Sequence, residues 1–66
     1  MFRMIDSRKI KELRESKGMT TRAFARKAGI STETLNAVEH GRRQPSVRTL
    51  SKIARALGVE ARDLFS

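Results

Sequence analysis

The stretch of sequence that most restricts the fold is TTRAFARKAGISTETLNAVEHG, residues 20–41. It predicts two short helices joined by a tight turn at GIS, residues 29–31. Ala25 is small enough to let the two helices approach closely. Gly29 can adopt the left-handed conformation that a sharp turn needs and that a residue with a Cβ adopts only at a cost. Together these residue types predict a rigid pair of helices that cross at a steep angle.

A glycine stands where each of four helical patterns stops, and a serine or threonine precedes each pattern. The glycines are Gly18, Gly29, Gly41 and Gly58, and the hydroxyl residues are Ser7, Thr20, Ser31 and Ser46. Hydroxyl side chains accept hydrogen bonds from unpaired N–H groups at a helix start, and glycine commonly closes a helix. These boundaries predict helices at 8–17, 21–28, 32–40 and 47–57, with a short fifth turn at 61–65. No alternating apolar pattern predicts a strand.

The 66 residues therefore predict one compact, all-α, five-helix domain, residues 1–66. Chains this short bury only roughly 60% of their unfolded surface, so the apolar core has to be efficient. The apolar spacing predicts a core of Ile10, Leu13, Met19, Phe24, Ala25, Ala28, Ile30, Leu35, Val38, Val47, Leu50, Ile53, Ala54, Leu57, Val59, Leu64 and Phe65. Residues 1–5 are too apolar for a plain solvated tail. Packing on the domain, a dimer contact and an artefact of start-site choice remain open for them.

The charge is strongly positive, with 15 Lys and Arg against 7 Asp and Glu and a net charge of +8. A domain this basic usually has a polyanionic partner, although a merely soluble cationic surface is the alternative. Between His40 and Val59 there is no acidic residue. The same segment holds Arg42, Arg43, Arg48, Lys52 and Arg55.

Several function classes lack the residues they need. The absence of cysteine excludes disulfides and cysteine-based zinc sites, and His40 is the only histidine, so no metal site is expected. No paired acids and no glycine-rich phosphate loop are present, so we expect neither an enzyme nor a cofactor. No apolar run approaches the ~20 residues that span a bilayer, and the N-terminus is too short and mixed for a signal peptide. A cytoplasmic protein without membrane contact is expected.

Nearly the whole chain resembles the Cro- and phage-repressor-like helix-turn-helix proteins, also called the xenobiotic-response-element family. The similarity runs from IKELRESKGMT through GISTETLNAVEHGRRQPSVRTLSKIARALGV to DLF. It implies a lambda-repressor-like domain whose helix-turn-helix spans residues 20–41. It also implies that a homodimer binds double-stranded DNA at a two-fold symmetric operator, as a repressor of transcription. The location implied is the bacterial nucleoid, or the protein is encoded by a phage.

The resemblance assigns base contacts to the third helix, through Thr32, Glu33, Asn36 and Ala37. Asn36 can pair bidentately with adenine, and Ala37 can offer its methyl group to thymine. Glu33 can accept from cytosine N4, or it can simply complement the helix dipole. No arginine or lysine occurs between Ser31 and His40, so any recognition of guanine has to come from elsewhere.

Contacts to DNA phosphates are implied for residues near the starts of the second and fourth helices and in the basic loop. They are Thr20, Thr21, Arg22, His40, Arg42, Arg43 and Ser46. Arg43 or Gln44 could instead reach an adjacent minor groove, and any single arginine could be a solvated surface charge. Thr21 departs from the family, which often has glutamine at this position. A threonine hydroxyl or Arg22 is then expected to replace the glutamine contact.

Arg14 and Glu39 occupy positions that form a partly buried ion pair in similar proteins. The planar guanidinium of arginine suits a bidentate bond to a carboxylate. The resemblance therefore implies a structural role for both residues, in which the pair holds the third helix to the first.

Two rival functions use the same fold. One is a protein-interaction adaptor such as an antitoxin or coactivator, and the other is a nonspecific nucleic-acid binder. The sequence does not distinguish a restriction-modification controller from a phage switch protein or an antitoxin. A dimer could form through the C-terminus, at Leu64 and Phe65, or through the apolar N-terminus.

Overall fold

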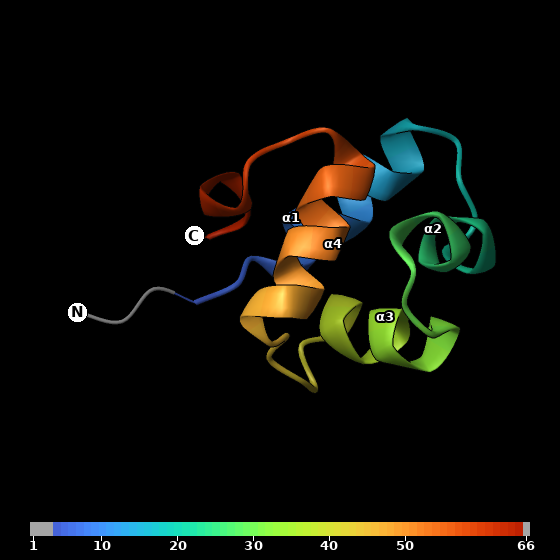
Figure 1. The fold of residues 1–66 in the computed structure, drawn as a ribbon. Helices are drawn as coiled ribbons and strands as arrows, with labels where there is room; N and C mark the ends of the chain where they lie inside the picture. The colour runs from blue at the N-terminus through green and yellow to red at the C-terminus, as the bar shows by residue number, and fades with distance from the viewer. Residues whose placement is uncertain (1–3, 66) are drawn as a thin grey trace.

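The computed structural model describes residues 4–65 of the chain. Its elements are α1 (Ser7–Ser16), α2 (Thr21–Ala28), α3 (Thr32–Glu39), α4 (Val47–Leu57) and a closing 3-10 turn, η1 (Ala61–Leu64). In Figure 1, α4 crosses in front of α1, α2 lies at the right, and α3 runs along the lower edge. The expected five helices are therefore four α-helices and one 3-10 turn. The last element is a 3-10 turn because its backbone bonds span three residues, as from Asp63 N to the carbonyl of Glu60 at 2.9 Å, and a capping box between Glu60 and Asp63 holds it.

Side-chain caps begin all four α-helices. Thr20, Ser31 and Ser46 accept from the backbone N–H groups three residues ahead, at 3.1, 3.0 and 3.1 Å, which confirms three of the predicted helix starts. The prediction for the first helix was wrong by one residue, because Asp6 rather than Ser7 is its cap. The Asp6 carboxylate accepts from Lys9 N at 3.1 Å, and Asp6 N donates to the carbonyl of Leu64 at 2.8 Å. This tie to the C-terminal turn keeps Asp6 outside the helix, so α1 begins at Ser7, and it ends at Ser16 because Lys17 is its C-cap. Both ends lie one residue earlier than predicted.

All four glycines close a helix with positive φ, as predicted. At the end of α2, Gly29 has φ 77°. Its N–H donates to Arg26 at 3.2 Å, and the next N–H, of Ile30, donates to Ala25 at 3.0 Å. This paired arrangement satisfies carbonyls that the helix itself leaves unpaired. The turn between α2 and α3 is short because these bonds reverse the chain within two residues.

The core lies where the helices meet, and most of its predicted members are buried or pack against it. Val47 is the exception, with 83% of its surface exposed. It continues the apolar stripe of α4, but it occupies the first turn and its Cβ points towards the helix N-terminus, beyond the core. Ala56, which was not predicted, is buried in the same helix.

The two ends of the described chain meet. Ile5 and Phe65 form an isolated antiparallel bridge, and both side chains pack against the core. Packing on the domain, one of the options left open for the N-terminal segment, thus holds for Ile5, while residues 1–3 lie outside the described residues. Within residues 4–65, no helix has the length and apolar character to cross a membrane.

Candidate nucleic-acid interface

The candidate interface begins with the α2–α3 pair, which the predicted residues hold together. Phe24 and Ala25 of α2 are buried in the same core cluster as Leu35 and Val38 of α3. Small and branched side chains at these positions let the helices approach closely without leaving a void. The pair is therefore fixed from the core side, and one face of α3 is left to solvent.

The four residues expected to contact bases lie on that solvent face. Thr32, Glu33 and Asn36 are exposed, and Ala37 is half-buried. Helical spacing places residues 33, 36, 37 and 40 on the side opposite the buried Leu35. The side chains of Thr32, Glu33 and Asn36 make no hydrogen bond within residues 4–65, so their polar groups are available to a ligand.

His40 follows α3 as its C-cap and is exposed. Its Nδ1 donates to the carbonyl of Asn36 at 2.8 Å, which fixes the ring against the last turn of α3. The other ring nitrogen is then the atom left for an outside partner. The α3 prediction was thus too long by one residue, because this residue caps the helix rather than extending it.

The residues expected to contact phosphate come from two places. Thr20 caps α2 and is exposed beside Arg22, whereas Thr21 is half-buried. On the other side, Ser46 caps α4, and Arg42 and Arg43 are exposed in the preceding loop. Helix starts carry free N–H groups and the positive end of the helix dipole, so both places attract anions.

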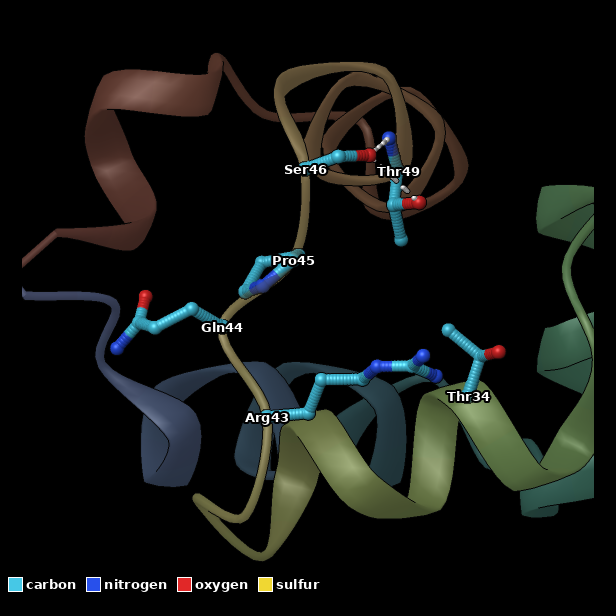
Figure 2. A pocket seen from close by; sticks show the side chains of 6 residues that line it. All are labelled: Thr34, Arg43, Gln44, Pro45, Ser46 and Thr49. Carbon is cyan, nitrogen blue, oxygen red and sulfur yellow. Dashed lines mark hydrogen bonds between the residues drawn. The ribbon is translucent and has the colours of Figure 1, made fainter.

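A cleft of about 330 Å³ lies between α3 and the start of α4, lined by Thr34, Arg43, Gln44, Pro45, Ser46 and Thr49. Figure 2 shows the Arg43 side chain running alongside α3 towards Thr34, while Gln44 points the other way. Thr34 and Thr49 were not among the predicted site residues. Each is the hydroxyl partner of a helix cap, at 2.8 Å from Ser31 and 3.1 Å from Ser46, and the repeated S-x-x-T spacing could have indicated them.

A second cleft lies between α2 and α4 and is strongly basic. Lys27, Arg48, Lys52 and Arg55 line it, together with Ala28 and Ser51. The ammonium group of Lys52 lies 3.5 Å from the carbonyl of Gly29, in the turn of the helix pair. Arg48, Lys52 and Arg55 belong to the acid-free segment of the sequence, but the sequence pattern does not indicate that they lie beside Lys27.

Charge is separated across the fold. Residues 17–59 hold nine of the lysines and arginines and only two acids, Glu33 and Glu39, of which Glu39 is buried. The remaining acids lie in or next to α1 and η1. Net positive charge is therefore concentrated in the segment that contains α2, α3, the following loop and α4, and this segment includes the exposed face of α3.

Arg14 and Glu39 form a buried, bidentate ion pair between α1 and α3. Arg14 Nε donates to Glu39 Oε2 at 2.7 Å, and Nη2 donates to Oε1 at 3.0 Å. The remaining nitrogen, Nη1, donates to the carbonyl of Met19 at 2.8 Å. The hydrogen bonds that Arg14 donates to Glu39 raise the pKa of the Arg14 guanidinium, against the opposing effect of burial. One side chain thus joins α1, the loop before α2, and α3.

The described residues bring together no group of three or more His, Cys, Asp or Glu that could hold a metal ion. The groups exposed at this surface offer hydrogen bonds and charge. Amide, hydroxyl and carboxylate groups project from α3, and guanidinium and ammonium groups surround it. Such a surface can bind a polyanion and can distinguish one pattern of donors and acceptors from another.

Comparison with known proteins agrees with this geometry. An uncharacterised HTH-type transcriptional regulator of Archaeoglobus fulgidus is 40% identical over 57 residues, covering 86% of this chain and 81% of that protein. The restriction-modification controller protein C.AhdI from Aeromonas hydrophila superposes with a TM-score of 0.85 at 34% identity, covering 89% of both chains. The biofilm master regulator SinR, solved in complex with DNA, gives a TM-score of 0.85 at 30% identity, covering 91% of this chain and 97% of its own.

The model of the helix-turn-helix family HTH_3 matches residues 10–64, which include most of α1 and all of α2, α3, α4 and η1. The sequence resemblance to Cro- and repressor-like proteins is thereby confirmed. The chain belongs to the HTH_3 family of helix-turn-helix proteins.

Proposed function

We propose that this protein is a sequence-specific, double-stranded-DNA-binding regulator of transcription that acts as a repressor. The observation that carries the proposal is the exposed face of α3, whose unpaired polar groups project from a surface rich in cations. DNA binding by the structural neighbour SinR, and the regulator names of the relatives, support it. In this proposal α3 enters the major groove and α2 crosses the DNA backbone.

Base recognition comes from the outward residues of α3. Asn36 pairs with adenine through its amide, and Ala37 contacts a thymine methyl group. Thr32 donates to a base or a phosphate at the start of the helix. Glu33 accepts from cytosine N4 and repels phosphate elsewhere, so it contributes to specificity rather than to affinity.

Affinity comes mainly from contacts to phosphate. The start of α2, with Thr20, Thr21 and Arg22, binds one stretch of backbone, and His40, Arg42 and Ser46 bind another. Each contact displaces a condensed counterion, so binding weakens steeply as the salt concentration rises. We propose further that a homodimer presents two copies of α3 about 34–36 Å apart to a two-fold symmetric operator.

The proposal is tested by DNA titration at several salt concentrations, with genomic fragments selected for binding. The double variant Thr32→Ala/Asn36→Ala is expected to lose the preference between operator and unrelated DNA while it keeps the salt dependence. Ser16→Ala is a matched control, because this exposed hydroxyl bonds only to Leu13 of its own helix. Binding by the wild type without sequence preference would favour a nonspecific binder.

A second candidate, a protein-interaction adaptor, is favoured by one neighbour. The SinR–SinI protein complex gives a TM-score of 0.86 at 30% identity, and this chain spans 59% of the matched chain. An adaptor on this fold would not need the exposed groups of α3. The same titration separates the two functions, because an adaptor would show neither a steep salt dependence nor an operator preference.

A further inference from the structure

The end of α3 directs the loop that follows it. Gly41 has φ 71°, its N–H donates to Val38 at 3.1 Å, and Arg42 N donates to the carbonyl of Ala37 at 2.9 Å. These paired bonds reverse the chain beside the last turn of α3. Arg43 is the second residue after Gly41, so it leaves this turn next to α3 rather than beyond its end.

The side chain of Arg43 extends from this turn back along α3. In Figure 2 it extends from the loop along α3, and its guanidinium ends beside Thr34. From Glu39 to Thr34 is five residues of helix, roughly 7.5 Å at 1.5 Å per residue. A cation from outside α3 therefore lies against the first half of that helix.

The Arg43 guanidinium is available to a ligand. Within residues 4–65 its side chain makes no hydrogen bond and no ion pair. The hydroxyl groups across the cleft are already engaged, since Ser31 donates to Thr34 at 2.8 Å and Ser46 donates to Thr49 at 3.1 Å. The donors of Arg43 thus face an open cleft, and among the described residues no hydrogen bond engages them.

The exposed face of α3 lacks a positively charged side chain. It offers an amide, a carboxylate, a hydroxyl and a methyl group, but residues 32–39 include no lysine or arginine. The commonest specific contact in the major groove is an arginine that donates two hydrogen bonds to guanine O6 and N7. Thr34 lines the cleft with Arg43, and Ala37, about one helical turn further along α3, is its neighbour on the helix surface.

We propose that Arg43 contacts guanine, donating to its O6 and N7 in the major groove beside the base pairs that α3 contacts. This inference rests on the proposed function and names a further residue that determines specificity. It differs from the phosphate or minor-groove contact that the sequence suggests for Arg43. The operator then contains a required guanine in each half-site, adjacent to the bases facing Thr34 and Ala37.

The test compares Arg43→Ala with Arg42→Ala, a neighbouring exposed arginine with the same loss of charge. Affinity is measured for a selected operator and for the three other bases at each position. Arg43→Ala is expected to lower the preference for guanine at one position per half-site by roughly 5- to 150-fold. Arg42→Ala should weaken all sequences equally and lower the salt slope by about 1.

Two further measurements refine the test. Arg43→Lys keeps the charge but loses the planar pair of donors, so it should also lose the guanine preference. Replacing the required guanine by 7-deazaguanine removes N7, and this should weaken wild-type binding but leave Arg43→Ala binding unchanged. Circular dichroism of each variant checks that the helices are retained.

The outcomes separate the two proposals. If the wild type prefers an operator and Arg43→Ala weakens all sequences uniformly, the guanine contact is refuted and recognition by α3 stands. If the wild type shows no preference for any sequence, the proposed function fails, and the role of Arg43 fails with it.

Discussion

Removing the Glu39 carboxylate should destabilise the domain more than any change at an exposed charge. In Glu39→Ala, Arg14 loses the acceptors of Nε and Nη2 and keeps only the bond from Nη1 to the carbonyl of Met19. The two side chains are 9% and 2% exposed, so water reaches the stranded guanidinium poorly. A buried charge without its partner costs several kcal/mol, since neither water nor protein replaces the lost acceptors.

The expected loss is about 3 kcal/mol, the lower end for a broken buried pair, because the bond to Met19 remains and the guanidinium is slightly exposed. A chain of 66 residues has a total stability of about 3–10 kcal/mol. A loss of this size lowers the melting temperature by roughly 12–24 °C in a small domain. Glu39→Ala is then left with about 0–7 kcal/mol and should melt well below the wild type.

Thermal melts followed by circular dichroism at 222 nm measure this loss. Arg62→Ala is the matched control, because its ion pair with Glu60 is also short, at 3.0 Å, but the side chains are 74% and 70% exposed. We expect that control to stay within about 0.5 kcal/mol of the wild type. The double variant Arg14→Met/Glu39→Leu should recover most of the stability, since no charge is left unpaired. If Glu39→Ala melts as the wild type does, the pair does not hold α3 to α1.

Three further predictions concern stability. Val47→Ser should leave the urea midpoint within about 0.5 kcal/mol of the wild type, whereas Leu50→Ala in the same stripe should cost about 2–5 kcal/mol. Equal losses at both positions would contradict the exposed placement of Val47. Gly58→Ala should cost about 1–2 kcal/mol from backbone strain alone, because φ is 75° and no atom lies within 4 Å of the added Cβ. An arginine with a raised pKa keeps its contribution at every pH below its unfolded value, so the gap in melting temperature between wild type and Glu39→Ala should not shrink from pH 7 to pH 10.

The helix boundaries were predictable because the groups that set them are local. A cap hydroxyl bonds three residues ahead, and a closing glycine bonds within its own turn, so each can be recognised in a short window of sequence. The cap of the first helix was predicted as Ser7 instead of Asp6, because the bond from Asp6 to Leu64 depends on where the C-terminal turn lies. Periodicity placed Val47 on the correct stripe, but it cannot indicate where along the helix the core ends.

The candidate site was predictable in its parts but not in its arrangement. The exposed face of α3 follows from helical spacing and from the resemblance to known helix-turn-helix proteins. Arg14 and Glu39 are 25 residues apart, and no local pattern pairs them, so only that resemblance indicated the contact. The position of Arg43 depends on the chain reversal at Gly41, which decides where the next side chain starts. The sequence alone shows that the loop is basic, but it does not show that the Arg43 side chain extends along α3.

The ion pair from Arg14 has a consequence for how this protein can diverge. The buried residues that attach α3 to the rest of the described domain are Leu35, Val38 and Glu39, all on its inner side. Thr32, Glu33 and Asn36 take no part in that attachment. Substitutions at these outer positions should therefore lower the free energy of unfolding only slightly. Natural proteins are only marginally stable, and most substitutions that are eliminated are those that lower stability too far. A duplicated copy of the gene could acquire a different surface chemistry on α3 in a few steps, each of them a folded protein.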